Sequence, residues 1–366
     1  MGKLAGIARL ASYPASRLLE RPSALPLNLT LSVTYACSSR CKTCEVWKKR
    51  ADNLRLDEYE RIFASLGGSI SWVTISGGDQ FSRADLPEIV RLVRERLRPE
   101  IINLPMNGLL KQRIETLLPE IAFHSRGLQL ILNLSIDDLG ERHDAIRGRP
   151  GAFERVTDTL RYIKRLKRRF PHIVLGIHTV VSRFNAERFP EIVESLRAFE
   201  PDSLISEVAE NRVELGTIER DISPTADQYA AAVDHLIQGI LAKRSRHPIG
   251  RLVESLRLEY YDLVKQTLRE LRQPIPCYAG WASAHIAPDG ELWGCCVRAE
   301  SFGNLRDHGY DFRAVWSSER AAAFRRSVIN RECACPLASA AYTNIALSPA
   351  RLLRVAANYL SLPRLP

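Results

Sequence analysis

The sequence predicts an α/β fold in which six strand–helix units form a partial (β/α)6 barrel, followed by a C-terminal α+β module. Apolar strand-like runs alternate with helical patterns between residues 28 and 222, and such alternation is typical of a parallel sheet with right-handed crossovers. The runs are apolar on both faces, as expected for a sheet that is covered on both sides. Six units are fewer than the eight of a closed TIM barrel, so we expect an open, TIM-like barrel with room for a large substrate.

The strand-like runs are recognised by β-branched and other apolar residues between turn signals. In chain order they cover residues 29–35, 72–76, 101–105, 128–136, 173–181 and 203–208. Apolar residues at helical spacing predict the connecting helices at 56–66, 86–97, a short helix ending at 118, 153–168 and 188–199. Residues 224–272 predict two helices without strands, and Pro274 and Pro276 then mark the start of a cysteine-rich segment.

The composition is that of a folded globular protein. The 366 residues are 45% hydrophobic and 26% charged, which suits one large domain or two modest ones. No apolar run approaches the ~20 residues that span a bilayer, and no secretory signal is visible, so we expect a cytoplasmic protein. The net charge is +10, but only 7% of residues are aromatic, which argues against a nucleic-acid partner held by base stacking. We divide the chain into an N-terminal extension (1–27), the barrel (28–222), a helical linker (223–272), the cysteine-rich module (273–340) and a C-terminal tail (341–366).

Three cysteines lie together after the first predicted strand. Cys37, Cys41 and Cys44 fall within one short loop, whereas a cubic iron–sulfur cluster normally takes four thiolates. Three thiolates hold three irons and leave the fourth iron open for chemistry. Zinc is the alternative, but zinc prefers four ligands, commonly in two pairs, and no fourth Cys or His lies within thirty residues. The pattern therefore favours an iron–sulfur cluster with an open iron.

Polar or glycine-rich elements follow the next predicted strands. Each is weak evidence alone, because a Gly-Gly pair after a strand is usually a turn. Chemistry in such folds lies at the carboxyl ends of the strands, so we expect these elements to gather beside the cysteine loop. They are Gly77-Gly78-Asp79, Asn107-Gly108, Ser135-Ile136-Asp137 and the segment that ends in Arg147-Gly148.

Together with the Cys37-x3-Cys41-x2-Cys44 spacing, these elements resemble the radical S-adenosylmethionine (SAM) enzymes over roughly residues 28–222. The resemblance implies a [4Fe-4S] cluster on the three cysteines, with the open iron binding the amino and carboxylate groups of SAM. It also implies an electron donor such as ferredoxin or flavodoxin. The reduced cluster passes one electron to SAM, and the 5′-deoxyadenosyl radical that forms abstracts hydrogen from an unactivated carbon. Sensitivity to oxygen is expected, and the protein positions the substrate and excludes water.

The resemblance assigns further residues to the cofactor pocket. Gly77-Gly78-Asp79 matches the family's Gly-Gly-Glu element at the SAM amino group, with Asp in place of Glu. Arg147 resembles the arginine that meets the SAM carboxylate, a pairing that suits a guanidinium. Many members have an aromatic residue before the third cysteine, where this chain has Thr43, so Trp47 is the nearest aromatic candidate to cover the cofactor. The positions that match the lining of the SAM pocket are Asn107, Ser135 and Asp137.

The other five cysteines lie in the C-terminal module. Twelve residues separate Cys277 from Gly290 and four separate Gly290 from Cys295, with a Pro-Asp-Gly hairpin signal between the two cysteines. This spacing resembles the auxiliary-cluster extensions of radical SAM enzymes, the SPASM and Twitch domains. It implies a second, auxiliary [4Fe-4S] cluster that accepts an electron from a substrate radical or binds the substrate. The ligands that we assign to it are Cys277, Cys295, Cys333 and Cys335.

Two alternatives stay open for this second site. The final pair is Cys-x-Cys, where the family usually has Cys-x-x-Cys, so Cys296 is an alternative to one of the four ligands. Zinc is the alternative metal, because four thiolates also suit a structural zinc site.

Three ionisable residues on or just after the last two predicted strands are candidates for chemistry in the cavity. We assign Glu207 as the catalytic residue that contacts the substrate, with Glu210 as a second acid. His178 is placed in the cofactor cavity, and the alternative is a satisfied interior histidine.

The substrate is expected to be a small molecule or a lipid precursor. Only about 27 residues precede the first strand, too few for the recognition domain that peptide-modifying members often carry. Apolar residues at helical spacing from Leu4 to Leu19 and from Leu352 to Leu362 are interleaved with Lys and Arg, which predicts peripheral contact with an anionic membrane surface. The alternative is that both helices cap the barrel. Peptide-modifying, RNA-modifying and non-catalytic electron-transfer proteins stay open as other classes.

Overall fold

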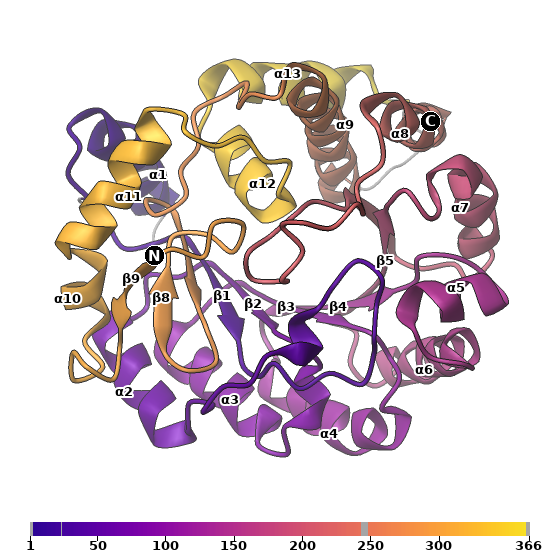
Figure 1. Ribbon diagram of the computed structural model, residues 1–366, viewed down its shortest axis with the longest axis horizontal. Helices are drawn as coiled ribbons and strands as arrows, with labels where there is room; N and C mark the ends of the chain where they lie inside the picture. The colour runs from indigo at the N-terminus through magenta and orange to yellow at the C-terminus, as the bar shows by residue number, and fades with distance from the viewer. Residues whose placement is uncertain (1–2, 23, 243–247, 364–366) are drawn as a thin grey trace.

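The protein is described by a computed structural model that covers residues 3–22, 24–242 and 248–363, without the side chains of residues 3–8 and 249. Figure 1 shows one twisted sheet with helices on both sides. The sheet has nine strands in the order β6-β5-β4-β3-β2-β1-β7-β8-β9. The first six strands are parallel to one another and form the barrel wall. Their bounds are β1 Asn28–Ser32, β2 Trp72–Ser76, β3 Ile101–Met106, β4 Gln129–Ser135, β5 Ile173–Val181 and β6 Ser203–Val208.

A crossover helix follows each of the first five barrel strands and packs on the outer face of the sheet (Figure 1). Buried side chains from these helices and the strands form one continuous hydrophobic core, to which Ile62, Val90 and Leu160 belong. This arrangement confirms the predicted partial barrel. The helices are α2 Leu56–Leu66, α3 Leu86–Leu92, α4 Lys111–His124, α5 Gly140–Arg147, α6 Ala152–Lys167 and α7 Phe189–Arg197.

Three boundaries differ from the sequence prediction by more than two residues. The first strand ends at Ser32 rather than Tyr35, because the next residues bond to the turn after β2: the Gly78 amide donates to the Thr34 carbonyl at 2.7 Å. The helix predicted over 86–97 changes to a π-helical turn at Val93–Leu97. The helix expected to end at 118 continues to His124 in spite of Pro119.

A second helical layer lies across the inner side of the barrel (Figure 1). It confirms the two helices predicted over 224–272, which are α8 Ala226–Ala242 and α9 Pro248–Glu270. With α12 Ala338–Ala346 and α13 Pro349–Ser361 they bury a separate core that includes Tyr229, Tyr260 and Tyr261.

The C-terminal module extends the barrel sheet. β7 Ser283–Ile286 pairs in parallel with β1, so that Asn28 lies beside Ser283 and Leu31 beside Ile286. The predicted hairpin joins β7 to β8 Glu291–Trp293 through the Pro-Asp-Gly turn, and β9 Ser301–Asn304 completes the sheet. Helices α10 Phe312–Trp316 and α11 Glu319–Ile329 follow. The module and the barrel therefore share one continuous hydrogen-bonded sheet.

The terminal helices pack against the body of the protein. In α1 Lys3–Leu18, Tyr13 is buried among Tyr278, Trp281 and Leu347, and Arg17 Nε donates to the Cys277 carbonyl at 3.2 Å. In α13, Arg354 Nε donates to Glu259 of α9 at 2.9 Å. These contacts favour the capping alternative over a membrane-bound one.

Among the described residues, no helix is both long and apolar enough to cross a membrane. The outer side of α13 exposes Leu352, Leu353 and Leu360, so contact with a membrane surface stays a prediction. Leu4, Ile7 and Ala8 of the N-terminal stripe fall outside the residues whose side chains are described.

Candidate active site

A large cavity of about 1040 Å³ is lined by residues of the barrel strands on one side and of the second helical layer on the other. Asn28, Trp72 and Gln129 line it at the amino ends of their strands, and Cys37 and Asp137 line it beyond the carboxyl ends. The cavity therefore follows the whole length of the strands. Leu256 of α9 and Tyr342 of α12 close its other side.

The three cysteines of the first loop all line this cavity. The loop is clamped to the C-terminal end of α5, because the amides of Arg40 and Lys42 donate to the carbonyls of Arg147 and Ile146 at 2.9 and 2.8 Å. Gly148 has φ +62°, and a Cβ there would lie 2.3 Å from the Arg40 carbonyl oxygen. Only glycine allows this close approach without a shift of the backbone.

The Gly77-Gly78-Asp79 turn packs against the start of the cysteine loop. A Cβ on Gly78 would lie 2.3 Å from the Ala36 carbonyl oxygen, so this turn packs backbone against backbone. The Asp79 carboxylate accepts a hydrogen bond from Ser38 Oγ at 2.6 Å, and burial raises its pKa. Asp79 thus orders the cysteine loop, while both glycines line the cavity where the SAM amino group is expected.

Arg147 and Asn107 lie beside the thiols. Arg147 Nη1 is 3.7 Å from Cys41 Sγ, and its Nη2 is 2.9 Å from Asp137 Oδ2. Asn107 Nδ2 donates to Ser38 Oγ at 3.0 Å and lies 4.0 Å from Cys37 Sγ. The predicted residues Asn107, Ser135, Asp137 and Arg147 therefore line one end of the cavity together.

The residues at this end fit a cluster with SAM. Burial raises the pKa of the Cys37 thiol to about 11 and that of Cys44 to about 12, so both bind a proton until iron replaces it. Arg147 Nε is buried without a hydrogen-bond partner among the described residues, and an unpaired guanidinium donor suits a cofactor carboxylate. When bound, the cluster and SAM would supply the radical chemistry, and these residues are the ones that would hold and orient them.

Trp47 is placed differently from the other predicted pocket residues. It does not line the cavity. The Arg40 guanidinium carbon lies 4.6 Å from the centre of the Trp47 ring instead. Its contact with the cofactor stays a prediction.

Four ionisable side chains on β5, on β6 and in the loop after β6 also line the cavity. His178 Nε2 lies 3.4 Å from Glu207 Oε1, and Arg212 Nη2 lies 2.8 Å from Glu210 Oε1. Burial raises the pKa of Glu210 to about 7. Sequence reasoning missed Arg212, because nothing in its local pattern shows that it meets the buried Glu210 and the half-buried Glu207.

The auxiliary cysteines converge on a second site. Burial raises the pKa of the Cys295 thiol to about 12, and the neighbouring Cys277 and Cys333 raise it further. The pKa of Cys335 is raised by burial and by Glu210, Cys277 and Cys295. The four thiols, from three segments of the chain, thus lie near enough to influence one another's pKa, as expected for a four-thiolate cluster.

Cys296 faces another group of residues. Burial raises its pKa, and the charged side chains acting on it are Glu214, Arg212 and Glu210. Of the cysteines, the adjacent Cys295 acts on it, and Cys335 packs against the apolar cluster that Cys296 forms with Leu337. The set Cys277, Cys295, Cys333 and Cys335 therefore stays a prediction, with Cys296 as the alternative to one of the four.

An open partial barrel with a three-cysteine loop and a second, cysteine-rich site defines a radical SAM enzyme with an auxiliary iron–sulfur centre. Family models agree: "Radical SAM superfamily" matches residues 31–196 and the SPASM "iron-sulfur cluster-binding domain" matches residues 277–336. The chain belongs to the radical SAM superfamily and carries a SPASM domain. Its cofactors are therefore SAM, a [4Fe-4S] cluster and an auxiliary iron–sulfur cluster.

Individual relatives are distant. The AdoMet-dependent heme synthase of Methanosarcina barkeri is 27% identical over 82% of this chain and 84% of its own length. The PqqA peptide cyclase of Rhodopseudomonas palustris is 24% identical over 88% of this chain and 81% of its own. The solved structure of native anSMEcpe with bound AdoMet superposes with a TM-score of 0.61 at 15% identity, covering 92% of this chain and 99% of that one. The structural match supports the fold.

Proposed function

We propose that this radical SAM enzyme modifies a peptide, by abstracting hydrogen from a carbon of one residue that the cavity encloses. The main observation behind this proposal is the length of the cavity. It follows β4 from Gln129 to beyond Ser135, and a strand of this kind rises about 3.3 Å per residue. An extended peptide of about six residues matches that length.

The relatives support a peptide substrate over the small molecule or lipid that we expected first. The PqqA peptide cyclase aligns over most of both chains. The shortness of the segment before β1 was the argument against a peptide, and this relative weakens it.

We assign roles along the cavity accordingly. Glu207, held beside His178 at 3.4 Å, is the acid–base group that contacts the peptide. The auxiliary cluster accepts the electron left on the substrate, which makes the reaction a net two-electron oxidation. A ferredoxin or flavodoxin supplies the electron that reduces the first cluster.

A porphyrin-type substrate is the second candidate. The heme synthase relative favours it, as do Arg251 and Arg257, which line the cavity opposite the sheet and suit carboxylate side chains.

The test uses the reconstituted full-length enzyme with SAM and dithionite under anaerobic conditions. We offer it pools of six-residue peptides that together place all residue types at the centre, and in parallel a porphyrin with propionate side chains. We expect a peptide pool to raise 5′-deoxyadenosine above the substrate-free rate and to yield a peptide lighter by two hydrogens. Stimulation by the porphyrin alone supports the second candidate, and stimulation by neither contradicts both. Cys41→Ala serves as the inactive control.

A further inference from the structure

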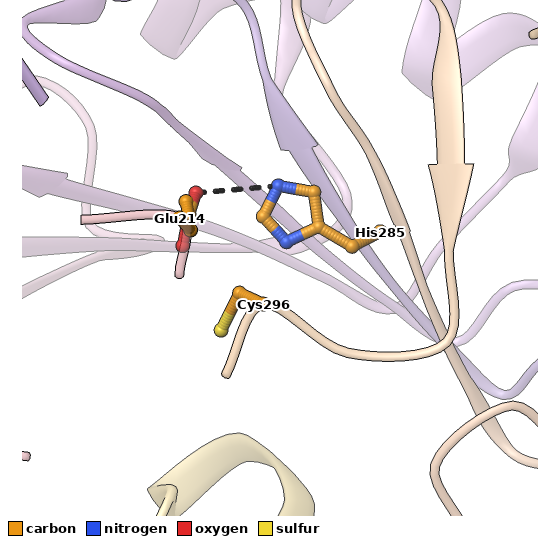
Figure 2. Close-up of side chains that lie close together, drawn as sticks. All are labelled: Glu214, His285 and Cys296. Carbon is orange, nitrogen blue, oxygen red and sulfur yellow. Dashed lines mark ion pairs between the residues drawn. The ribbon is translucent and has the colours of Figure 1, made fainter. Parts of the chain in front are cut away.

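Three side chains of metal-binding type meet in the cavity, and none of them is among the predicted ligands of the two clusters. They are Glu214 from the loop after β6, His285 of β7 and Cys296 just beyond β8. One ligand atom from each lies within 4.8 Å of the other two. Figure 2 shows the three side chains converging from three separate segments. All three are buried, and all three line the cavity.

The backbone holds this group in place. The amides of Val213 and Glu214 donate to the carbonyls of Val297 and Cys296 at 2.9 and 3.3 Å, which joins the two loops that carry Glu214 and Cys296. Ser32 Oγ lies 2.9 Å from both Glu214 Oε1 and His285 Nε2. Such support reduces the cost of ordering ligands around an ion.

Cys296 is available for this role when the auxiliary cluster takes its predicted ligands Cys277, Cys295, Cys333 and Cys335. Cys335 packs beside Cys296, but the thiol of Cys296 lies within 4.8 Å of a ligand atom of Glu214 and of His285.

The charge of the cavity wall points to a cation. Glu207, Glu210 and Glu214 surround a single guanidinium, that of Arg212, which lies 2.8 Å from Glu210 and 3.8 Å from Glu207. Glu207 is also paired with His178, and Glu210 with Arg212, so the excess of negative charge lies at Glu214 beside His285, and uncompensated buried charge is costly. A divalent ion beside Glu214 balances that excess.

We propose that Glu214, His285 and Cys296 bind one divalent transition-metal ion, of the zinc or ferrous class, whose remaining coordination position faces the cavity. A mixed sulfur, nitrogen and oxygen set suits these ions. Three protein ligands with one open position are typical of sites that take a water or a substrate group. The open position takes an oxygen or nitrogen donor of the substrate and orients it. That last step rests on the proposed function, but binding of the ion does not.

The test measures metal binding without any substrate. The full-length protein is reconstituted with both clusters, freed of loose metal and titrated with Co²⁺. We expect about one Co²⁺ per chain beyond the iron, with a thiolate-to-cobalt charge-transfer band, since the set holds one thiolate. Cys296→Ser removes the band, and His285→Gln weakens binding by about 100-fold. Iron content stays that of the parent in both variants.

The matched control is His308→Gln, an exposed histidine of the same module, which leaves Co²⁺ binding unchanged. X-ray absorption at the cobalt edge of the parent protein is independent of any variant. It should show one sulfur together with nitrogen and oxygen ligands. A shell of sulfur alone, a shell without sulfur, or no bound Co²⁺ overturns the proposal. So does loss of iron in Cys296→Ser, because it would place Cys296 on the auxiliary cluster.

Discussion

The two cysteine sites bring their thiols together in different ways. Cys37, Cys41 and Cys44 come from one loop. The backbone of this loop packs directly against the backbone of Gly78 and of Gly148, where a Cβ atom would not fit. The predicted auxiliary thiols come from residues as far apart as Cys277 and Cys335, in a module that the pairing of β7 with β1 and the hairpin of β7 and β8 attach to the barrel.

This difference should change how strongly each site responds to substitutions and to metal binding. The first site depends on the shape of one short segment, so a single methyl group in its support should disrupt it. The auxiliary site depends on tertiary folding, and binding of its metal adds to the stability of that folding.

The largest effect should separate the two sites by activity. Cys41→Ala should lower 5′-deoxyadenosine formation by about 100-fold or more, because the cluster loses one of three thiolates. Cys335→Ser should lose iron from the auxiliary site but keep substrate-free SAM cleavage within about twofold, since its ligand comes from another segment. Chromatographic assay of 5′-deoxyadenosine and iron content measure both. Equal loss of cleavage in the two variants would show that the sites form as a unit.

A smaller effect should come from the support of the first loop. In Gly78→Ala the new Cβ meets the Ala36 carbonyl oxygen at 2.3 Å, so the cysteine loop has to move. We expect SAM affinity to fall by about 10–100-fold, as with other changes beside metal ligands. Equilibrium binding of SAM to the reconstituted protein measures it. Gly68→Ala is the control, because its Cβ meets no atom closer than 3.8 Å; equal affinities for the two variants would contradict the clamped loop.

The smallest effect concerns the joint between barrel and module. Glu58 of α2 accepts from Arg306 Nε at 2.7 Å and from Tyr310 Oη at 2.9 Å. The hydrogen bond from Arg306 lowers the pKa of the buried Glu58 carboxyl from 4.5 to about 2. A depressed folded-state pKa stabilises the fold above the unfolded value, and that stability is lost as the pH falls from 4.5 through 2.

Glu58→Gln should therefore lower the free energy of unfolding at pH 7 by about 2 kcal/mol, less than for a fully buried pair because Arg306 reaches solvent. The deficit should shrink as the pH falls from 4.5 towards 2. Urea midpoints, followed by tryptophan fluorescence at equal starting iron content, measure this. Glu95→Gln, which removes a surface pair with Arg91, should cost at most about 0.5 kcal/mol. Glu58 also accepts a hydrogen bond from the Arg55 amide at the start of α2, and a deficit independent of pH would indicate that this bond, not the charge, matters.

Much of the barrel could be predicted because its signals are local. The runs at Trp72–Ser76, Ile173–Val181 and Ser203–Val208 match the strands residue for residue, since apolar runs between turn signals depend on near neighbours only. The pairing of β7 with β1 joins residues about 250 positions apart in the chain, and no local pattern encodes such a partner. Arg212 is only two residues from Glu210 and five from Glu207, but their contact depends on the path of the loop after β6, which the sequence did not show.

The sequence by itself determined the class of chemistry, because the ligands of the first cluster are neighbours in the chain and their spacing is the site. The tertiary structure decided how the remaining cysteines are shared. Cys295 and Cys296 are adjacent in sequence, yet one thiol joins the auxiliary set and the other faces Glu214 and His285. That division depends on which distant segments pack on either side of the chain, and only the folded protein brings those segments together.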